Sequence, residues 1–461
     1  MPVRLSGLRV RHGVVAVAFL LVLSLPFALR PEREEPTAAG GSHLPARELV
    51  IVSPHAESIR REFEWAFSDW AAETQGFRVK IQWLDVGGTL QAIRYVADQF
   101  EQTPGGIGID IFFGGGVDPF MHLGGKGLLH RCSLPEEVLE PIPQTYAGME
   151  VYARDRSWFG ACLAGFGILY NKDVLQFLDT AEPATWEDLG AAGYFTWVSS
   201  ADPRQSGSMH MVYEIILQAY GWEEGWETVM RIGANCRGFS RQASDVPREV
   251  ATGEAACGMA IDTYALRAVA EVGEDRMGFR LPDHLTVVNP DGIGVLKGAP
   301  NVEVAELFVQ FVLSEEGQKL WILRRGAPGG PKEFQLYRLP VLPGLARRCG
   351  EDAVVTFDPF EFEGGVAFDP EKKNVRWQIL NDLIGARIID TRQELAEAWR
   401  HLRKLPDGHH RKAELLKPPV PEQQLLELAE SKWDDPYFRA ETVARWSREA
   451  RALYRRLKEG L

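Results

Sequence analysis

Two patterns of apolar and polar positions alternate along the chain from residue 48 onward. Short apolar runs at 49–52, 79–84 and 109–113 are typical of buried strands, and each is followed by a turn rich in Gly, Pro or Ser. Between the runs, apolar residues recur every three or four positions from Ile59 to Trp70 and again from Leu90 to Phe100, which predicts a helix in each interval. Strands that alternate with helices indicate a parallel sheet, and such sheets bind ligands at the carboxyl ends of their strands.

A second series of the same kind begins near residue 164 and predicts another lobe. Each of its strands leads through a short loop into a helix. After it, extended chain and a long helix with an inward apolar face return the chain to the first lobe. The predicted segments are strands at 195–199 and 256–261, helices at 209–220 and 262–272, extended chain over 285–296, and a helix over 304–320.

The N-terminus has the pattern of an export signal. Three arginines precede the uncharged stretch 13–29, an order that keeps the N-terminus cytoplasmic while the rest of the chain crosses the membrane. No clean small-x-small cleavage site ends the stretch, so residues 1–30 are either a signal peptide or an uncleaved signal anchor. Residues 31–47 are charged and rich in Pro and Gly, which predicts a linker. The body is therefore expected in the periplasm or outside the cell.

Composition narrows the class of protein. The 461 residues are 45% apolar and 25% charged, which is typical of a globular chain with two or three folding units. Acidic residues number 64 against 51 basic ones, so the net charge of −13 argues against a nucleic-acid partner. The five cysteines show no CxxC spacing and predict no zinc site or dithiol motif. Export permits up to two disulfides, but buried free thiols are the favoured interpretation.

Six short motifs follow one another at the expected loops and crossings. They are Ser53-Pro54-His55, Asp85-Val86-Gly87-Gly88-Thr89, Phe113-Gly114-Gly115-Gly116, Phe166-Gly167-Ile168-Leu169-Tyr170-Asn171-Lys172-Asp173, Ala201-Asp202-Pro203 with Ser206-Gly207-Ser208, and Asn289-Pro290-Asp291-Gly292-Ile293. Each short Gly run alone is a weak signal, whereas six in order are specific. Over residues 48–345 the chain resembles family 1 extracellular solute-binding proteins, and within them the iron(III)-type, AfuA-like branch.

The resemblance implies an α/β protein with the two-lobed periplasmic-binding-protein type II fold and a hinge. It divides the body into lobe one at 48–163, lobe two at 164–286 and a return to lobe one at 287–390, and the helical C-terminal extension at 391–461 is an addition to the family core. It also implies an exported, substrate-binding component of an ABC import system, which presents a small solute to a membrane permease. No catalytic residue and no cofactor is expected.

Lobe one contributes six candidate ligand-binding residues from three loops. Gly residues and hydroxyls at a helix start let an anion approach unpaired backbone N–H groups, and a Gly run lets backbone approach a ligand. The alternatives are ordinary helix capping, a tight turn, and a structural histidine. The candidates are Ser53, His55, Gly88, Thr89, Gly114 and Gly115.

Lobe two contributes a second set of candidates. Ser206, Gly207 and Ser208 precede a helix and could bind an anion, with N-capping as the alternative. Asp262 and Tyr264 follow a strand and could meet a cation, an amine or a metal. Iron-binding members of the resembled family carry two neighbouring tyrosines, whereas this chain has one. Tyr264 is therefore a candidate metal ligand, with a partly buried packing residue as the alternative.

The solute class stays open between two chemistries. Ferric ion with a synergistic anion is one, and a small anion that bears a phosphate or carboxylate is the other. No GxSxG, Walker or HExxH motif occurs, so an enzyme is not expected. The alternative functions are an enzyme on the same scaffold, with Asp262 as base, and a membrane-anchored sensory ectodomain.

The C-terminal extension predicts further helices. Thr391 with Glu394 three residues later has the pattern of a capping box. A final helix is expected from about residue 440, with an apolar stripe that packs against lobe one or, alternatively, against a partner helix. The stripe comprises Val443, Trp446, Ala450, Leu453 and Leu457.

Overall fold

The structure is a computed structural model that describes residues 44–146, 149–361 and 365–459. The predicted signal at 1–30 lies outside these ranges, as does most of the predicted linker. The chain from Ala46 onward forms one compact unit. Within the described ranges, no helix is both long and apolar enough to cross a membrane.

Lobe one is built on three parallel strands with helices between them, as predicted. Strand β1 lies in the middle, with Val52 beside Leu84 on one side and Phe112 on the other. Because the strands run the same way, their carboxyl ends lie at one edge. Strand β1 begins inside the predicted linker. The elements are β1 (Ala46–Val52), α2 (Glu57–Thr74), β2 (Arg78–Leu84), α3 (Thr89–Gln102), β3 (Ile111–Phe113), α4 (Asp118–Gly125), α5 (Glu136–Leu139), β4 (Thr145–Tyr146) and β5 (Met149–Glu150).

Two long strands cross from one lobe to the other. Strand β6 (Phe159–Asn171) is buried along its whole length. Its first half pairs antiparallel with β11 (Val288–Val295), and its second half pairs with β9 (Cys257–Ile261) and β10 (Met277–Arg280). With β7 (Val198–Ala201) and β8 (Cys236–Ser240), the sheet order β2-β1-β3-β11-β6-β9-β7-β8 is therefore continuous through both lobes.

Lobe two repeats the parallel arrangement. Strand β7 (Val198–Ala201) pairs in parallel with both β8 (Cys236–Ser240) and β9, so the carboxyl ends of these strands share an edge. Strand β8 was not predicted. The helices and 3-10 turns are α6 (Lys172–Phe177), η1 (Glu187–Gly190), η2 (Ala192–Tyr194), α7 (Gly207–Tyr220), α8 (Trp222–Asn235), α9 (Asp245–Ala251) and α10 (Asp262–Val272).

The long helix expected at 304–320 is in fact two helices. They are α11 (Val302–Leu313) and α12 (Glu315–Ile322), and Ser314 between them has extended backbone. Its hydroxyl accepts a hydrogen bond from the amide of Gly317 at 3.2 Å, so it caps the start of α12. Both helices pack against α2 of lobe one.

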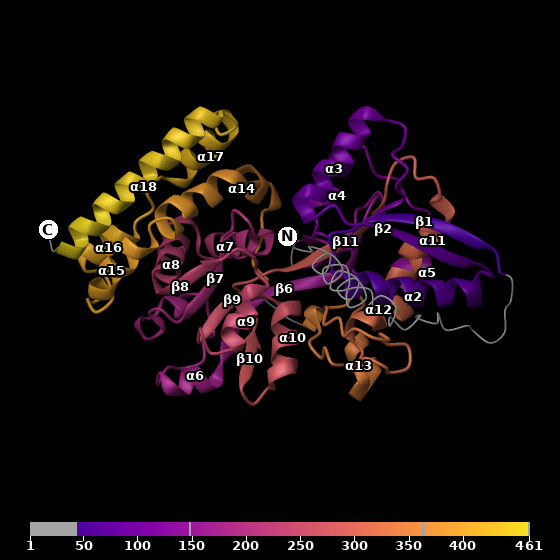
Figure 1. Cartoon of the computed structure of the whole chain (residues 1–461), viewed down its shortest axis with the longest axis horizontal. Coiled ribbons are helices and arrows are strands. Elements are labelled where there is room, and N and C mark those ends of the chain that lie inside the picture. The colour runs from indigo at the N-terminus through magenta and orange to yellow at the C-terminus, as the bar shows by residue number, and fades with distance from the viewer. Residues whose placement is uncertain (1–43, 147–148, 362–364, 460–461) are drawn as a thin grey trace, which may run out of the picture. The chain divides into compact units, whose positions relative to one another are not determined.

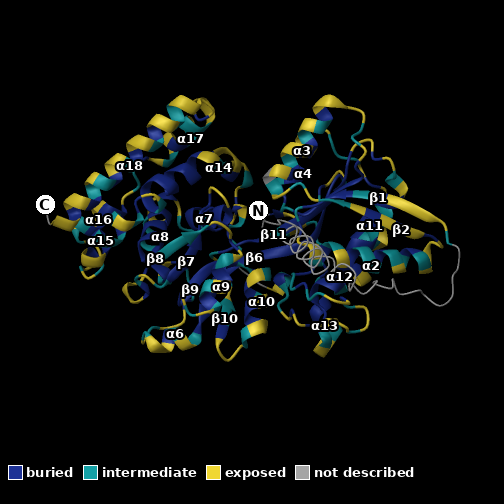
Figure 2. Ribbon diagram, in the orientation of Figure 1, coloured by how far each residue is buried: buried dark blue, intermediate teal, exposed yellow. Residues whose placement is uncertain are grey.

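Each lobe has an aromatic core, and most buried residues lie between the sheet and its covering helices (Figure 2). In lobe one, the ring centroids of Phe63 on α2 and Trp321 on α12 lie 4.5 Å apart. In lobe two, Trp226 is fully buried in the same hydrophobic cluster as Trp399 and Tyr454 of the C-terminal extension. Lobe two and the extension therefore share one core. The five cysteines are free thiols, four buried and Cys349 half-buried.

The helices from α14 (Pro370–Ile384) to α18 (Pro436–Glu459) lie beside α7 and α8 of lobe two and are called the extension from here on (Figure 1). Helix α14 falls within the stretch 287–390 that was expected to return to lobe one, but it packs on α7, α17 and α18 instead. The stripe on α18 contacts α14, α15 and α16, so the expectation that it packs against lobe one is wrong. Thr391 precedes α15, but its hydroxyl donates to the carbonyl of Arg387 at 2.8 Å instead of capping that helix. The elements that follow α12 are α13 (Leu345–Cys349), η3 (Gly350–Asp352) and η4 (Pro359–Glu361), and then those of the extension, α14 (Pro370–Ile384), the π-helical turn η5 (Gly385–Ile389), α15 (Arg392–Leu402), α16 (His410–Leu416), α17 (Glu422–Ser431) and α18 (Pro436–Glu459).

Candidate functional site

The carboxyl edges of the two lobes meet the crossing strands. In lobe one, Phe113 at the end of β3 pairs with Ile293 of β11. In lobe two, Ile261 at the end of β9 pairs with Phe166 of β6. The segments that follow the parallel strands of each lobe carry the residues predicted from the sequence, so these residues lie at the two carboxyl edges.

Ser53 and His55 are buried parts of the framework. The Ser53 hydroxyl donates to the Phe113 carbonyl at 2.7 Å and accepts from the His55 amide at 3.1 Å, so it ties the ends of β1 and β3 together. Nε2 of His55 lies 2.9 Å from Oδ2 of Asp291 on the crossing strand β11. The imidazole meets Phe113 edge-on, with ring centroids 4.6 Å apart. Both residues support the structural interpretation.

The glycine run after β3 has three consecutive positive φ values, +97°, +89° and +77°. A Cβ atom at Gly114 would lie 2.5 Å from Nε2 of His55, and one at Gly115 would lie 2.9 Å from Cγ2 of Thr89. The amide of Gly116 donates to Oδ1 of Asp291 at 2.8 Å. Glycine is therefore required by backbone conformation and by close packing on the protein itself.

The start of α3 is the accessible part of the lobe-one edge. Gly88 is exposed and Thr89, the first helical residue, is half-buried. The contact with Gly115 brings this helix start beside the glycine run. The first N–H groups of a helix have no partner inside the helix, and the positive end of its dipole favours an anion. Of the lobe-one candidates, Gly88, Thr89 and Gly115 can meet a solute.

Ser206 caps α7 in lobe two. Its hydroxyl accepts from the amide of Met209 at 3.3 Å, and the residue is buried. Gly207 is exposed and Ser208 is half-buried. A Cβ atom at Gly207 would lie 3.6 Å from the Trp377 ring of α14, so the extension borders this helix start. The capping interpretation therefore holds for Ser206, while Gly207 and Ser208 remain accessible.

Asp262 is turned inward. Its Oδ2 accepts from the Gly165 amide at 2.8 Å and its Oδ1 from the Thr263 amide at 2.6 Å. Burial raises the pKa of Asp262 to about 7, although Arg338 and the two amides favour its charged form. Tyr264, two residues later, is 42% exposed. The carboxylate is engaged with the protein, whereas the phenol is open to solvent.

Asp291 and Arg338 belong to the same buried group, and the sequence did not single them out as candidates. Nη1 of Arg338 lies 3.4 Å from Oδ2 of Asp291. Burial opposes ionisation of Asp291, but His55, Arg338 and the Gly116 amide together hold its pKa well below the ordinary value. Asp291 lies within a quoted motif, so chain position alone could have flagged it. Arg338 lies in no motif.

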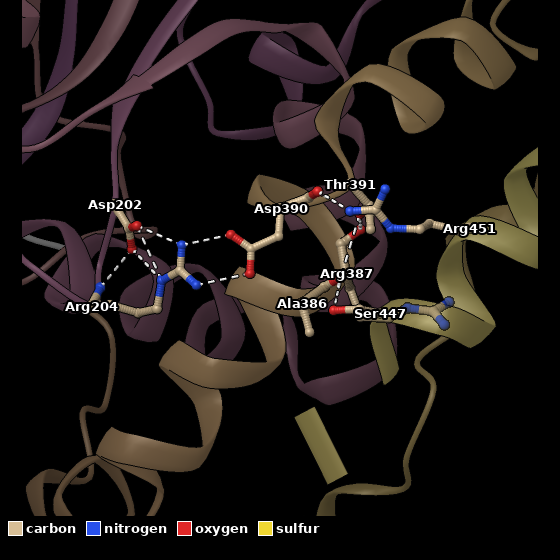
Figure 3. Close-up of polar contacts among 8 residues, drawn as sticks. All are labelled: Asp202, Arg204, Ala386, Arg387, Asp390, Thr391, Ser447 and Arg451. Carbon is tan, nitrogen blue, oxygen red and sulfur yellow. Dashed lines mark hydrogen bonds and ion pairs between the residues drawn. The ribbon is translucent and has the colours of Figure 1, made fainter. Parts of the chain in front are cut away.

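The extension also docks on the loop before α7 (Figure 3). The Arg204 guanidinium donates to Asp202, with Nη2 2.7 Å from Oδ2, and to both carboxylate oxygens of Asp390 at 3.0 Å. Its hydrogen bonds to Asp202, which outweigh burial, and those to Asp390 raise the pKa of Arg204. Beyond Asp390, Nη2 of Arg451 on α18 donates to the Asp390 carbonyl at 2.8 Å. Two ion pairs of Arg204 and a hydrogen bond from Arg451 to the Asp390 backbone therefore join the loop before α7 to the last helix.

Other features lie elsewhere. A surface hollow of about 470 Å³ is lined by Arg47, Glu48 and Asn301 at the amino end of β1, on the edge opposite the loops. Among the described residues, no group of three or more His, Cys, Asp and Glu side chains is placed to hold a metal ion. His409 and His410 stack on each other at the start of α16 in the extension.

The comparison with known proteins agrees with this architecture. The profile of the family described as bacterial extracellular solute-binding protein matches residues 65–336, more than half of the chain. The chain belongs to this family. It is therefore the solute-binding component of an ABC import system, a class whose members work outside the cytoplasmic membrane, bind small ligands and partner with membrane permeases.

Individual relatives are distant. The phosphoglycerate transport regulatory protein PgtC of Salmonella typhimurium is 23% identical over 385 residues, which cover 83% of this chain and 85% of PgtC. The periplasmic binding protein AfuA of Actinobacillus pleuropneumoniae, solved with fructose-6-phosphate, is 20% identical. It has a TM-score of 0.56 and covers 78% of this chain and 99% of its own. Apo ferric ion-binding protein A of Pasteurella haemolytica is 16% identical, with a TM-score of 0.56 over 73% of this chain and 96% of its own.

These structures establish the two-lobed fold that the sequence predicted. The family and the structural neighbours are binding proteins.

Proposed function

We propose that this protein captures a small phosphorylated organic anion between its two lobes and delivers it to a membrane permease. The observation that carries the proposal is that helix starts are accessible at the two carboxyl edges, whereas the carboxylates there are buried and already hydrogen-bonded. Besides the Tyr264 phenol, the accessible candidates there are helix starts with small polar residues, Gly88 and Thr89 on α3 and Gly207 and Ser208 on α7. Such helix starts bind phosphate through backbone N–H groups and hydroxyls.

The donor set fits ferric ion less well. Fe(III) prefers several anionic oxygen ligands, and Tyr264 is the accessible phenol at the lobe-two edge. The carboxylates of Asp262 and Asp291 are buried and already accept hydrogen bonds from amides and from His55. A ferric cargo would have to displace these partners or draw most of its oxygens from a bound anion.

Two relatives support a phosphorylated solute. The name of PgtC refers to phosphoglycerate, and AfuA was solved with fructose-6-phosphate. Binding needs no covalent chemistry: ligand contacts from both lobes stabilise the closed form in proportion to their preference for it. If the signal is retained, it would hold the protein at the membrane beside its permease.

Calorimetry with phosphoglycerate, fructose-6-phosphate, inorganic phosphate and ferric citrate tests the proposal. At least one phosphorylated compound should bind, and Thr89→Ala/Ser208→Ala should weaken it by at least about a hundredfold, because each hydrogen bond to a charged group contributes about 1.5–3 kcal/mol. Thr103→Ala, at the other end of α3, is the matched control. Ser206→Ala should lose about 1 kcal/mol of stability and keep its affinity, since Ser206 caps α7. Binding of ferric citrate alone would refute the proposal.

A further inference from the structure

Helix α14 of the extension is fixed to lobe two by buried polar contacts. Arg376 donates to Glu214 of α7, with Nε 2.8 Å from Oε1 and Nη2 2.6 Å from Oε2, and both side chains are fully buried. Five residues further along, Oδ1 of Asn381 lies 2.7 Å from Nδ1 of the buried His210. Breaking a buried ion pair of this kind is strongly destabilising, so α14 moves with α7.

The same helix also reaches lobe one. Lys373 is 2% exposed, and its ammonium pairs with the carboxylate of Asp118, the first residue of α4. Helix α4 is held to lobe one by Phe120, whose ring packs on β11 so closely that a Cβ atom at Gly292 would lie 2.3 Å from it. The ion pair between Lys373 and Asp118 therefore joins a helix of the lobe-two assembly to a helix of lobe one.

This ion pair lies at the edges of the expected cleft. Asp118 follows the glycine run of lobe one after a single intervening residue. Trp377, one turn after Lys373, packs over Gly207 at the start of α7, and the Lys373 ammonium lies 5.2 Å from the centroid of its ring. The pair thus links the accessible loops of both lobes, and it is separate from the His55–Asp291 contact at the crossing strands.

We propose that Lys373 is a positioning residue for solute binding, supplied by the C-terminal extension, which holds the two lobes together in the closed form. The inference rests on the proposed function, since it assumes that the solute is bound between the lobes. Separation of the lobes would break the pair, so whatever it contributes is present only while the lobes are together, and it favours that form selectively. Apparent affinity falls in proportion to the population of the binding-competent form.

The test combines solution scattering of the ligand-free protein with calorimetry on phosphoglycerate and fructose-6-phosphate. Lys373→Met and Asp118→Asn should each increase the radius of gyration and weaken binding about tenfold. The exchanged pair Lys373→Asp/Asp118→Lys should restore both values toward wild type. Lys412→Met is the matched control, because Lys412 is 5% exposed, pairs with Asp407 inside the extension and lies 5.5 Å from the centroid of the Trp399 ring.

The outcomes that would overturn the proposal are specific. Wild-type scattering and affinity in Lys373→Met and Asp118→Asn would overturn the proposal, and so would an exchanged pair that adds the two defects instead of relieving them. Melting curves identify a variant that has unfolded, and Asp118→Asn serves as the milder of the two because its side chain is 35% exposed. If neither compound binds to wild type, the proposed solute is wrong, while the scattering of the ligand-free variants still decides whether the ion pair holds the lobes together.

Discussion

Asp291 and Asp262 both act on the Arg338 guanidinium, and their environments shift their pKa values in opposite directions. For Asp291, the imidazole of His55, the guanidinium and the Gly116 amide outweigh the cost of burial, so its pKa is lowered. For Asp262, burial outweighs the guanidinium and two amides, so its pKa rises to about 7. Near neutral pH, the crossing therefore carries one ionised carboxylate and one that gains or loses a proton.

This difference predicts a pH dependence of stability. The pKa of Asp262 rises from its ordinary value of 3.8 to about 7 on folding, so between these values the folded protein holds a proton that the unfolded chain has released. The stabilising contribution is complete below pH 4 and is lost as the pH rises through 7. At about 1.4 kcal/mol for each pKa unit, the change is up to about 4 kcal/mol.

Urea unfolding of wild type and Asp262→Asn at a series of pH values from 4 to 8 measures this effect. The variant cannot ionise at this position, so the free energy of unfolding of wild type should fall relative to that of the variant as the pH rises. Asp291 titrates below this range and affects both proteins alike. Parallel curves for the two proteins would mean that Asp262 is ionised throughout, held so by Arg338.

At the scale of helices and strands, local patterns predicted most of the fold. Strands β1, β2, β7 and β9 and helices α2, α3, α7 and α10 follow from apolar periodicity, because each depends on residues close in sequence. The break between α11 and α12 was missed because the apolar period continues across Ser314, and only its cap reveals the end of one helix. Strand β8 was missed because its five residues Cys-Arg-Gly-Phe-Ser carry little apolar pattern.

The site was only partly predictable, for a physical reason. Loops at strand ends are marked by Gly and Ser, so the sequence could place Thr89 and Ser208 at the carboxyl edges of the two lobes. It could not distinguish a hydroxyl that is open to solvent from one that is hydrogen-bonded to the protein backbone, as those of Ser53 and Ser206 are. Nor could it indicate Lys373, whose partner Asp118 lies 255 positions away and matters only because the fold brings the two together.

A buried aromatic pair shows how the extension is built into the protein. Trp446 of α18 is 3% exposed and stacks on Trp433, with ring centroids 5.4 Å apart. Both belong to the hydrophobic cluster that also contains Trp226 of lobe two. Trp446→Ala should therefore destabilise the whole unit by about 3–5 kcal/mol in a single cooperative transition. The exposed neighbour variant Arg445→Ala should stay within about 0.5 kcal/mol of wild type.

Circular dichroism during urea unfolding, followed together with tryptophan fluorescence, distinguishes the possibilities. Coincident transitions at lower urea are expected for Trp446→Ala. A separate early transition that leaves lobe two intact would instead mean that the extension folds as an independent domain.

For the molecule as a whole, the connections between lobes decide how it can respond to a solute. Strand β6 runs through both lobes, β11 pairs with its lobe-one half, and a register shift between Asp291 and Gly292 interrupts that pairing. A continuous strand keeps the sheets of the lobes joined, and an irregularity of this kind bends the strand locally. The lobes are therefore connected both through β6 and through the ion pair between Lys373 and Asp118.

Solute binding should change shape and stability together. A ligand held by both lobes binds the closed form better than the open one, so saturating phosphoglycerate or fructose-6-phosphate should reduce the radius of gyration. The same contacts are absent from the unfolded chain, so stability should rise by about 2.7 kcal/mol at a hundredfold excess over Kd, and the melting temperature with it. X-ray scattering and thermal unfolding on one titration series measure both. A raised melting temperature with unchanged scattering would show that the solute binds to a single lobe or to a molecule that is already closed. The Lys373→Met variant separates these two cases. Its radius of gyration should fall on binding only if the ion pair had closed the wild type beforehand.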